Sequence, residues 1–160
     1  MKVVLFLCTG NYYRSRFAEE IFNFSAPVEC PGWTAISRGI GVDLGVNNMG
    51  PIAKSAAHAL ESRGIAFNCK LARMPLQLKT ADLETADHIV ALKKAEHLPL
   101  MQERFPSWLG SNESDRIEYW HVDDVDQMVS EQALPLIADE LQILMRRLSG
   151  NPVADLALQH

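Results

Sequence analysis

The sequence predicts a single α/β domain with a mostly parallel sheet that helices cover on both faces. Short apolar runs rich in strand-forming residues alternate along the chain with segments whose apolar residues recur at helical spacing. The chain has 160 residues, about the length of one domain, and it contains no internal repeats, low-complexity tracts or linkers. These observations favour βαβ units within one hydrophobic core.

The first half of the chain predicts two strands and two helices. Residues 2–7 form a continuous apolar run, as expected of a strand buried on both faces. A helical pattern starts at Ser15 and is expected to end at Pro27. Residues 33–37 read as a second strand, and residues 51–63 as a helix with proline near its first turn.

The second half predicts two more strands and ends in a long helix. After an irregular stretch over 66–80, Thr80 is expected to cap a short helix. The remaining expected elements are a strand over 87–92, a helix through Leu98 to Phe105, a polar loop over 106–115, a strand over 117–120, and a helix from about Glu131 to Leu148. We therefore expect a domain over residues 1–149 and a loosely held tail over 150–160.

Composition and charge exclude several classes of partner. The net charge of −5 offers no general attraction to nucleic acid or to an anionic membrane. No apolar stretch is long enough to span a membrane, and the apolar run at the start is too short for a secretion signal. The three cysteines, Cys8, Cys30 and Cys69, are odd in number and show no metal-ligand spacing. We therefore expect a cytoplasmic protein without a metal site.

The loop after the first strand carries the strongest chemical signal. It reads Cys8-Thr9-Gly10-Asn11-Tyr12-Tyr13-Arg14-Ser15 and lies where a buried strand passes into a helix. Such junctions present free backbone N–H groups and the positive end of the helix dipole to an anion. Gly10 and Asn11 both tolerate a left-handed backbone, so the loop is expected to curl around its ligand.

Within this loop, Cys8 and Arg14 predict chemistry at phosphorus. Arg14 offers a planar fork that suits two phosphate oxygens. A cysteine in such a positive bowl ionises readily, and its thiolate is a nucleophile aimed at the bound phosphorus. The alternative interpretation is a structural cysteine at a strand end and a surface arginine on a helix.

The segment Cys8 to Ser15 resembles the phosphate-binding loop of the low-molecular-weight protein tyrosine phosphatases. Further likenesses to the family cover nearly the whole chain: Ser37-Arg38-Gly39 after the second strand, Ala72-Arg73, Asp82-Leu83 and Ala86-Asp87-His88-Ile89-Val90 in the middle, and the acidic loop before the last helix. The resemblance implies a four-stranded parallel sheet and hydrolysis of phosphotyrosine through a cysteinyl-phosphate, with no cofactor.

The resemblance also implies roles for individual residues. Cys8 would be the nucleophile, Arg14 the phosphate clamp, Ser15 a partner of the thiolate, and Asn11 a residue that holds the shape of the loop. The rest of the loop, Thr9, Gly10, Tyr12 and Tyr13, would complete the binding site. The expected ligands are a phosphotyrosine protein or a small aryl phosphate, and phosphate-like anions in the loop.

Departure of a phenolate calls for a general acid, because the conjugate phenol has a pKa near ~10. Asp123, Asp124 and Asp126 follow the strand over 117–120 and are the candidates at that sheet edge. Matching the Asp-Pro pair of the family places the acid at Asp124, with Val125 in the proline position. Asp126 as the acid and a merely solvated acidic turn remain the alternatives.

Departures from the family pattern bear on substrate choice and on oxidation. Tyr13 occupies the position of a second cysteine that is common in the family, so a neighbouring thiol that could trap oxidised Cys8 is missing. Aromatic residues common after the acid are replaced by Gln127 and Met128. Two other functions therefore stay open: an arsenate reductase of the same fold, with Cys69 as a lone relay candidate, and a phosphoprotein-binding module without catalysis.

Overall fold

The computed structural model describes residues 1–150, and these form a four-stranded sheet in which every strand runs parallel to its neighbours. The strands are β1 (Lys2–Cys8), β2 (Trp33–Gly39), β3 (His88–Ala91) and β4 (Ile117–Tyr119). Their order across the sheet is β2-β1-β3-β4. The predicted fold class is therefore confirmed.

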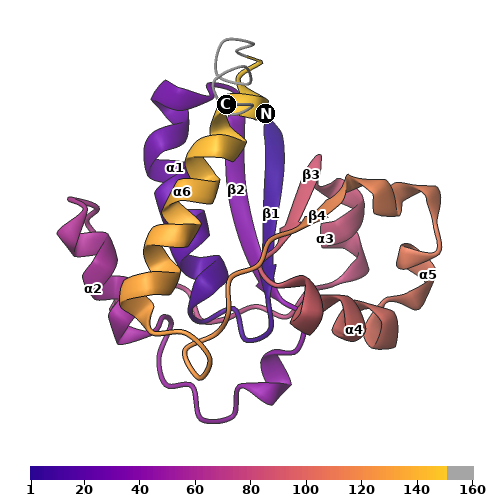
Figure 1. The fold of residues 1–160 in the computed structure, drawn as a ribbon, viewed down its shortest axis with the longest axis horizontal. Helices are drawn as coiled ribbons and strands as arrows, with labels where there is room; N and C mark the ends of the chain where they lie inside the picture. The colour runs from indigo at the N-terminus through magenta and orange to yellow at the C-terminus, as the bar shows by residue number, and fades with distance from the viewer. Residues whose placement is uncertain (151–160) are drawn as a thin grey trace.

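Helices cover both faces of the sheet (Figure 1). One face carries α1 (Arg14–Glu29), α2 (Lys54–Ser62) and α6 (Ser130–Leu148), which pack against one another. The other side carries α3 (Thr80–Thr85), α4 (Lys94–Arg104) and α5 (Pro106–Leu109). Two 3₁₀ helices, η1 (Val42–Leu44) and η2 (Asn112–Arg116), lie in the connections.

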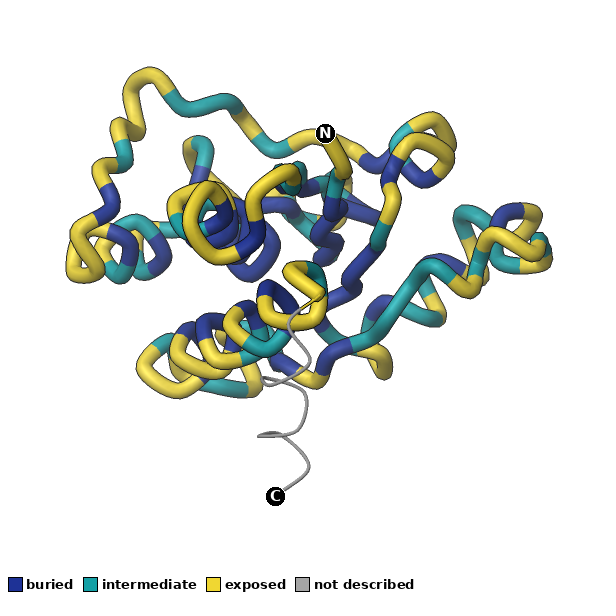
Figure 2. The backbone as a smooth tube through the Cα atoms, turned by 90° about the horizontal axis from the view of Figure 1, so that it is seen from above, coloured by how far each residue is buried: buried dark blue, intermediate teal, exposed yellow. Residues whose placement is uncertain are grey.

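The side chains of β1 alternate between the two faces of the sheet, and each face has its own hydrophobic core. Val4 and Phe6 face α1 and α6, whereas Leu5 and Leu7 face the layer of α3 and α4. All four side chains are fully buried, as expected of a central parallel strand. Buried positions accordingly follow the strands and the inward faces of the helices (Figure 2). This rigid centre ends at Cys8, so it fixes the start of the loop that follows.

Three local predictions were wrong. Helix α1 runs through Pro27 to Glu29, because a proline in the last turn removes only one hydrogen bond. Lys79 rather than Thr80 precedes α3, and its backbone N–H donates to the Asp82 carboxylate. The polar stretch 106–115 is not a plain loop, since Pro106 begins the short helix α5.

The other elements lie close to their expected positions, with ends shifted by a few residues. The tail expected over 150–160 lies outside the described residues except for Gly150. Within residues 1–150, no helix combines the length and the apolar character that crossing a membrane requires.

The parallel strands bring four segments to one edge of the sheet. The segments after β1, β2, β3 and β4 all leave from the carboxyl ends of neighbouring strands. In open α/β sheets this edge is where ligands bind. It gathers the loop after Cys8, the start of α4, and the acidic segment after Tyr119.

Candidate active site

The backbone of the loop from Cys8 to Ser15 curls between the end of β1 and the start of α1. Asn11 has φ of 50°, the only positive φ of a non-glycine residue in the described part of the chain. Backbone N–H groups from Thr9 to Tyr13 donate to no acceptor within residues 1–150. Helix α1 begins at Arg14 and adds the positive end of its dipole. Successive free amides at a helix start form a binding site for an oxyanion.

Gly39 supports this loop by allowing a close approach between two backbone segments. Gly10 does not adopt the positive φ that the sequence suggested, and a Cβ there would approach only the exposed amide of Asn48, at 2.9 Å. At Gly39, a Cβ would lie 2.7 Å from the carbonyl oxygen of Thr9 and 3.0 Å from the nitrogen of Asn11. The end of β2 therefore supports the loop from behind because Gly39 has no side chain.

The side chain of Asn11 holds the loop to its surroundings and is fully buried. Its Nδ2 donates to Ser15 Oγ and to Ser37 Oγ, both at 2.9 Å. Its Oδ1 accepts from Arg73 Nη1 at 2.9 Å and from the backbone N–H of Leu76 at 3.0 Å. The geometry fits the shape-holding role expected of Asn11.

Arg73 and Glu19 complete this support, and sequence reasoning missed both roles. Arg73 Nη2 donates to Ser37 Oγ at 3.0 Å and lies 3.2 Å from Oε2 of Glu19. Glu19 stands four residues after Ser15 on the inward face of α1, a spacing that could have revealed it. Arg73 lies in an irregular segment that gave no local signal for the contact.

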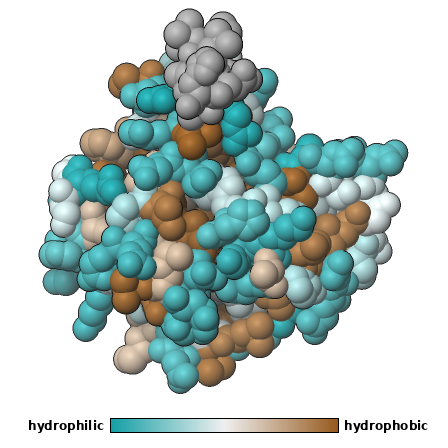
Figure 3. Space-filling view, viewed as in Figure 1, coloured by the Kyte–Doolittle hydropathy of each residue, from teal (hydrophilic) through white to brown (hydrophobic). Residues whose placement is uncertain are grey.

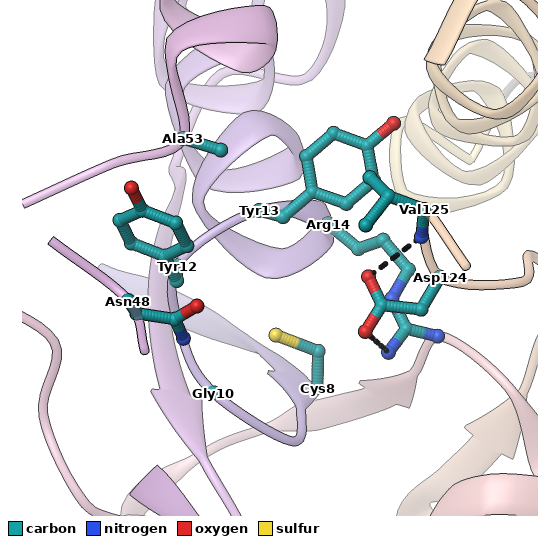
Figure 4. Close-up of a pocket in the computed structure, with 9 residues that line it drawn as sticks. All are labelled: Cys8, Gly10, Tyr12, Tyr13, Arg14, Asn48, Ala53, Asp124 and Val125. Atoms are coloured by element: carbon teal, nitrogen blue, oxygen red, sulfur yellow. Dashed lines mark hydrogen bonds and ion pairs between the residues drawn. The ribbon is translucent and has the colours of Figure 1, made fainter. Parts of the chain in front are cut away.

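Cys8 is the last residue of β1 and is 2% exposed. Its Sγ lies 2.9 Å from Ser15 Oγ, a contact that a serine hydroxyl can make to a thiolate as donor. Ser15 is fully buried, so its side chain, like that of Asn11, supports the loop from inside. Figure 4 shows the sulfur at the floor of the pocket.

Arg14 lies beside Cys8 with its guanidinium almost fully buried. Nη1 donates to the carbonyl oxygen of Val122 at 2.9 Å, and Nη2 donates to Glu96 Oε2 at 2.6 Å. Nε is buried and has no partner among the described residues, which leaves a donor free for a bound anion. Burial alone would lower the pKa of Arg14, but the nearby Cys8 and Glu96 raise it, so the cation persists.

Asp124 is the carboxylate of the acidic segment that reaches the pocket. Its Oδ2 lies 3.6 Å from Nη2 of Arg14, and its Oδ1 accepts from the backbone N–H of Val125 (Figure 4). Asp123 forms an ion pair with Lys93 at 3.1 Å, and Asp126 is exposed and does not line the pocket. Only Asp124 of the three faces Cys8 across the cavity.

The pocket above Cys8 has a volume of about 130 Å³ and mixed walls. Its nine lining residues are Cys8, Gly10, Tyr12, Tyr13, Arg14, Asn48, Ala53, Asp124 and Val125. Tyr12 stands beside Asn48, and Tyr13 lies on the side of Val125 (Figure 4). Burial raises the pKa of Tyr13 to about 12, so its hydroxyl stays protonated.

The side chain of Thr9 does not line this pocket, so any part that Thr9 takes in binding falls to its backbone N–H. Its Oγ1 instead donates to Glu96 Oε2 at 2.5 Å. Within residues 1–150, no group of three or more histidine, cysteine or acidic side chains is placed to hold a metal ion. All three cysteines are free, and Cys30 lies beyond the far end of α1, about 24 Å along the helix.

Comparison with known proteins places this geometry in context. Residues 3–151 match the sequence model of a family described as low molecular weight phosphotyrosine protein phosphatase. No curated protein sequence matches the chain.

Solved structures that share the fold include the following three. Wzb of Vibrio vulnificus in complex with benzylphosphonate has a TM-score of 0.73 at 19% identity, covering 92% of this chain and 99% of that one. A low molecular weight protein tyrosine phosphatase from T. tengcongensis has a TM-score of 0.69 at 26% identity, covering 92% and 97%. The YwlE arginine phosphatase from Geobacillus stearothermophilus has a TM-score of 0.64 at 23% identity, covering 100% and 98%.

Proposed function

Because the chain belongs to the low molecular weight phosphotyrosine protein phosphatase family, a family of cysteine-dependent enzymes, we propose that Cys8, Arg14 and Asp124 are its catalytic residues. The reaction is hydrolysis of a phosphomonoester through a cysteinyl-phosphate. The observation that carries the assignment of Cys8 is the set of free donors around its sulfur. Five backbone N–H groups and Nε of Arg14 have no acceptor within residues 1–150.

These donors match the charge that develops during phosphoryl transfer. The equatorial oxygens of the transferring group bear the negative charge, and fixed donors stabilise it without reorganising. Arg14 adds a positive charge that the Val122 carbonyl and Glu96 already hold in place. The loop is therefore preorganised for the transition state.

Each step then has a residue to perform it. The Cys8 thiolate attacks phosphorus, the bond from phosphorus to the ester oxygen breaks, and Asp124 gives its proton to the departing oxygen. The resulting Asp124 carboxylate takes a proton from water, whose oxygen attacks phosphorus and releases phosphate and the Cys8 thiolate. Ser15 donates to the sulfur whenever it is anionic.

The pocket walls support an aryl phosphate, in a protein or in a small molecule, as the substrate. Tyr12, Tyr13 and Val125 offer apolar surface to a ring, and the pocket has one carboxylate, Asp124, at the place of the leaving group. The Vibrio vulnificus relative binds benzylphosphonate, an aryl compound with a phosphate-like head. We further propose that the enzyme works in the cytoplasm, where a reducing environment keeps Cys8 as a thiol.

Family membership does not favour arsenate reduction. That reaction needs a thiol relay, and Cys69, its candidate, is exposed and does not line the pocket above Cys8. The phosphoprotein-binding module differs from the enzyme only in turnover, so kinetics must separate the two.

Turnover of p-nitrophenyl phosphate and of a phosphotyrosine peptide at about pH 5.5, without added metal, tests the proposal. Wild type and Cys69→Ser should turn over both substrates, and Cys8→Ser should turn over neither. A phosphoarginine peptide serves as the competing substrate, and arsenate with a thiol reductant as the competing reaction. Vanadate binding by a wild type that turns nothing over would refute the enzyme and favour the binding module.

A further inference from the structure

We infer that Glu96 is a positioning residue for catalysis: its carboxylate holds Arg14 at the phosphate site and keeps that cation from pairing fully with Asp124. Glu96 lies in the first turn of α4, at the carboxyl end of β3. This inference rests on the proposed roles of Arg14 and Asp124, and it assigns a residue that neither the loop motif nor the acidic segment contains.

One oxygen of Glu96 accepts hydrogen bonds from both ends of the phosphate loop and also lies close to the neighbouring ring of His97. Oε2 accepts from Arg14 Nη2 at 2.6 Å and from Thr9 Oγ1 at 2.5 Å, and it lies 2.8 Å from Nε2 of His97. Arg14 and Thr9 belong to the two ends of the phosphate loop, so a single carboxylate connects them. A guanidinium held by a charged acceptor has one rotamer and a fixed direction for its remaining donors.

His97 lies on the buried side of this carboxylate, with Nε2 2.8 Å from Oε2 but without the geometry of a hydrogen bond. The ring is fully buried, and its Nδ1 accepts from the backbone N–H of Lys93 at 3.0 Å. Burial lowers the pKa of His97, so the ring is neutral and its proton is on Nε2, the atom that approaches Glu96. The tautomer is therefore set by a backbone hydrogen bond.

Glu96 stays charged throughout the working range of pH. Burial would raise its pKa, but His97, Arg14 and Thr9 lower it far below the ordinary value of a glutamate. The side chain is 33% exposed, so a substitution there does not open a cavity in the core.

Glu96 also influences Asp124, because the two carboxylates share the guanidinium of Arg14. Both carboxylates approach the same nitrogen of Arg14, Glu96 at 2.6 Å and Asp124 at 3.6 Å. Because Glu96 makes the shorter contact with Arg14, it partly neutralises the guanidinium. Asp124 keeps only the longer contact with the same nitrogen. A general acid beside a neutralised cation holds its proton to higher pH than one beside a free cation.

The other charged groups around this cluster are compensated or neutral. Lys93 pairs with Asp123 at 3.1 Å on the adjoining segment, and Tyr13 stays protonated because burial raises its pKa to about 12. Cys8 and Asp124 both lie beside Arg14, so a change of charge at this cation acts on both. Loss of the Glu96 charge should therefore displace both limbs of a bell-shaped pH profile in one direction.

The test is the pH dependence of p-nitrophenyl phosphate turnover for wild type, Glu96→Gln and Glu96→Asp. Glu103→Gln is the matched control, since it removes the same charge from an exposed position of the same helix. We expect Glu96→Gln to lower kcat about tenfold or more and to weaken inhibition by inorganic phosphate. Its whole pH profile should move to lower pH by about half a unit or more.

Glu96→Asp keeps the charge, so its profile should stay at the wild-type pH while kcat recovers in part. A Glu96→Gln profile that coincides with that of Glu103→Gln would overturn the inference. So would a lower kcat or melting temperature without a shift in the profile, because that result marks a merely structural role. If Cys8→Ser instead turned over substrate at the wild-type rate, the proposed function itself would be refuted. Failure of this inference and failure of the proposed function are therefore distinguishable.

Discussion

The phosphate loop and the acidic segment face each other across one pocket, but they are built in opposite ways. In the loop from Cys8 to Ser15, the buried side chains of Asn11 and Arg14 each have two or more partners on other elements. In the segment from Asp123 to Val129, most side chains are partly or fully exposed, and Asp123 is tied to the fold by its ion pair with Lys93.

The difference reflects what each part must do. Stabilising the charge of a transferring phosphoryl group requires several hydrogen-bond donors in fixed positions. Hydrogen bonds and ion pairs to neighbouring elements must hold these donors in place. Delivering one proton requires a single oxygen within reach, the role that we propose for Asp124. We therefore expect substitutions at several positions of the phosphate loop to lower the activity. In the acidic segment, only substitution of Asp124 should lower it.

The largest effect beyond loss of Cys8 should come from Arg14→Lys. Lysine keeps the positive charge but lacks the fork that contacts Val122 and Glu96 and leaves Nε for the ligand. We expect kcat/KM for p-nitrophenyl phosphate to fall about a thousandfold. Activity within threefold of wild type would show that the charge alone is sufficient and that the fixed geometry is not needed.

The next effect compares two acids of one segment. Asp124→Asn should lower kcat about a hundredfold or more, whereas Asp126→Asn, at an exposed position, should change it less than twofold. The Asp124→Asn defect should be larger for phenyl phosphate than for p-nitrophenyl phosphate, because the more basic phenolate needs the proton more. Equal losses for both variants would contradict the assignment of the acid.

A smaller effect is expected behind the loop. Arg73→Ala removes donors to Asn11 and Ser37 and leaves Glu19 without its closer cation. We expect kcat to fall about tenfold and the free energy of unfolding to fall by about 1–3 kcal/mol. The control is Arg63→Ala at an exposed position, which should change neither quantity. Unchanged urea unfolding and kinetics for Arg73→Ala would show that the loop holds its shape alone.

The smallest effect concerns stability against pH. Burial lowers the folded-state pKa of His97 below its unfolded value of about 6.5, so the unfolded chain binds a proton first as the pH falls. The stability from neutral His97 is therefore present above pH ~6.5 and declines below it. Between pH 7.5 and pH 5, the melting temperature of wild type should fall further than that of His97→Gln. Parallel losses in the two proteins would contradict this source of acid sensitivity.

The sequence was sufficient for the sheet and for the phosphate loop because both depend on local patterns. The apolar run before Cys8 specifies a buried strand, and the glycine and asparagine that follow Cys8 are typical of a curled loop between a strand and a helix. The boundary errors at Pro27 and Pro106 have a common origin, since proline is compatible with a helix at its first and last turns.

The supports of the loop could not be predicted because they come from distant segments. Arg73 reaches Asn11 from an irregular stretch, and Glu96 reaches Arg14 from a helix more than eighty residues later. Only the rule that parallel strands share a carboxyl edge pointed toward Glu96. The same rule brought Asp124 into consideration, and its proposed role rests on the family resemblance and on the pocket, which Asp124 lines and Asp126 does not.

The most direct test of the central claim is to identify the phosphorylated residue. The Asp124→Asn variant should be mixed rapidly with p-nitrophenyl phosphate, quenched in acid, digested and examined by mass spectrometry. We predict one phosphoryl group, attached to the sulfur of Cys8, on the peptide that contains this residue. The Cys8→Ser variant should carry none. A phosphoryl group on another residue, or turnover by an enzyme that never carries one, would contradict it.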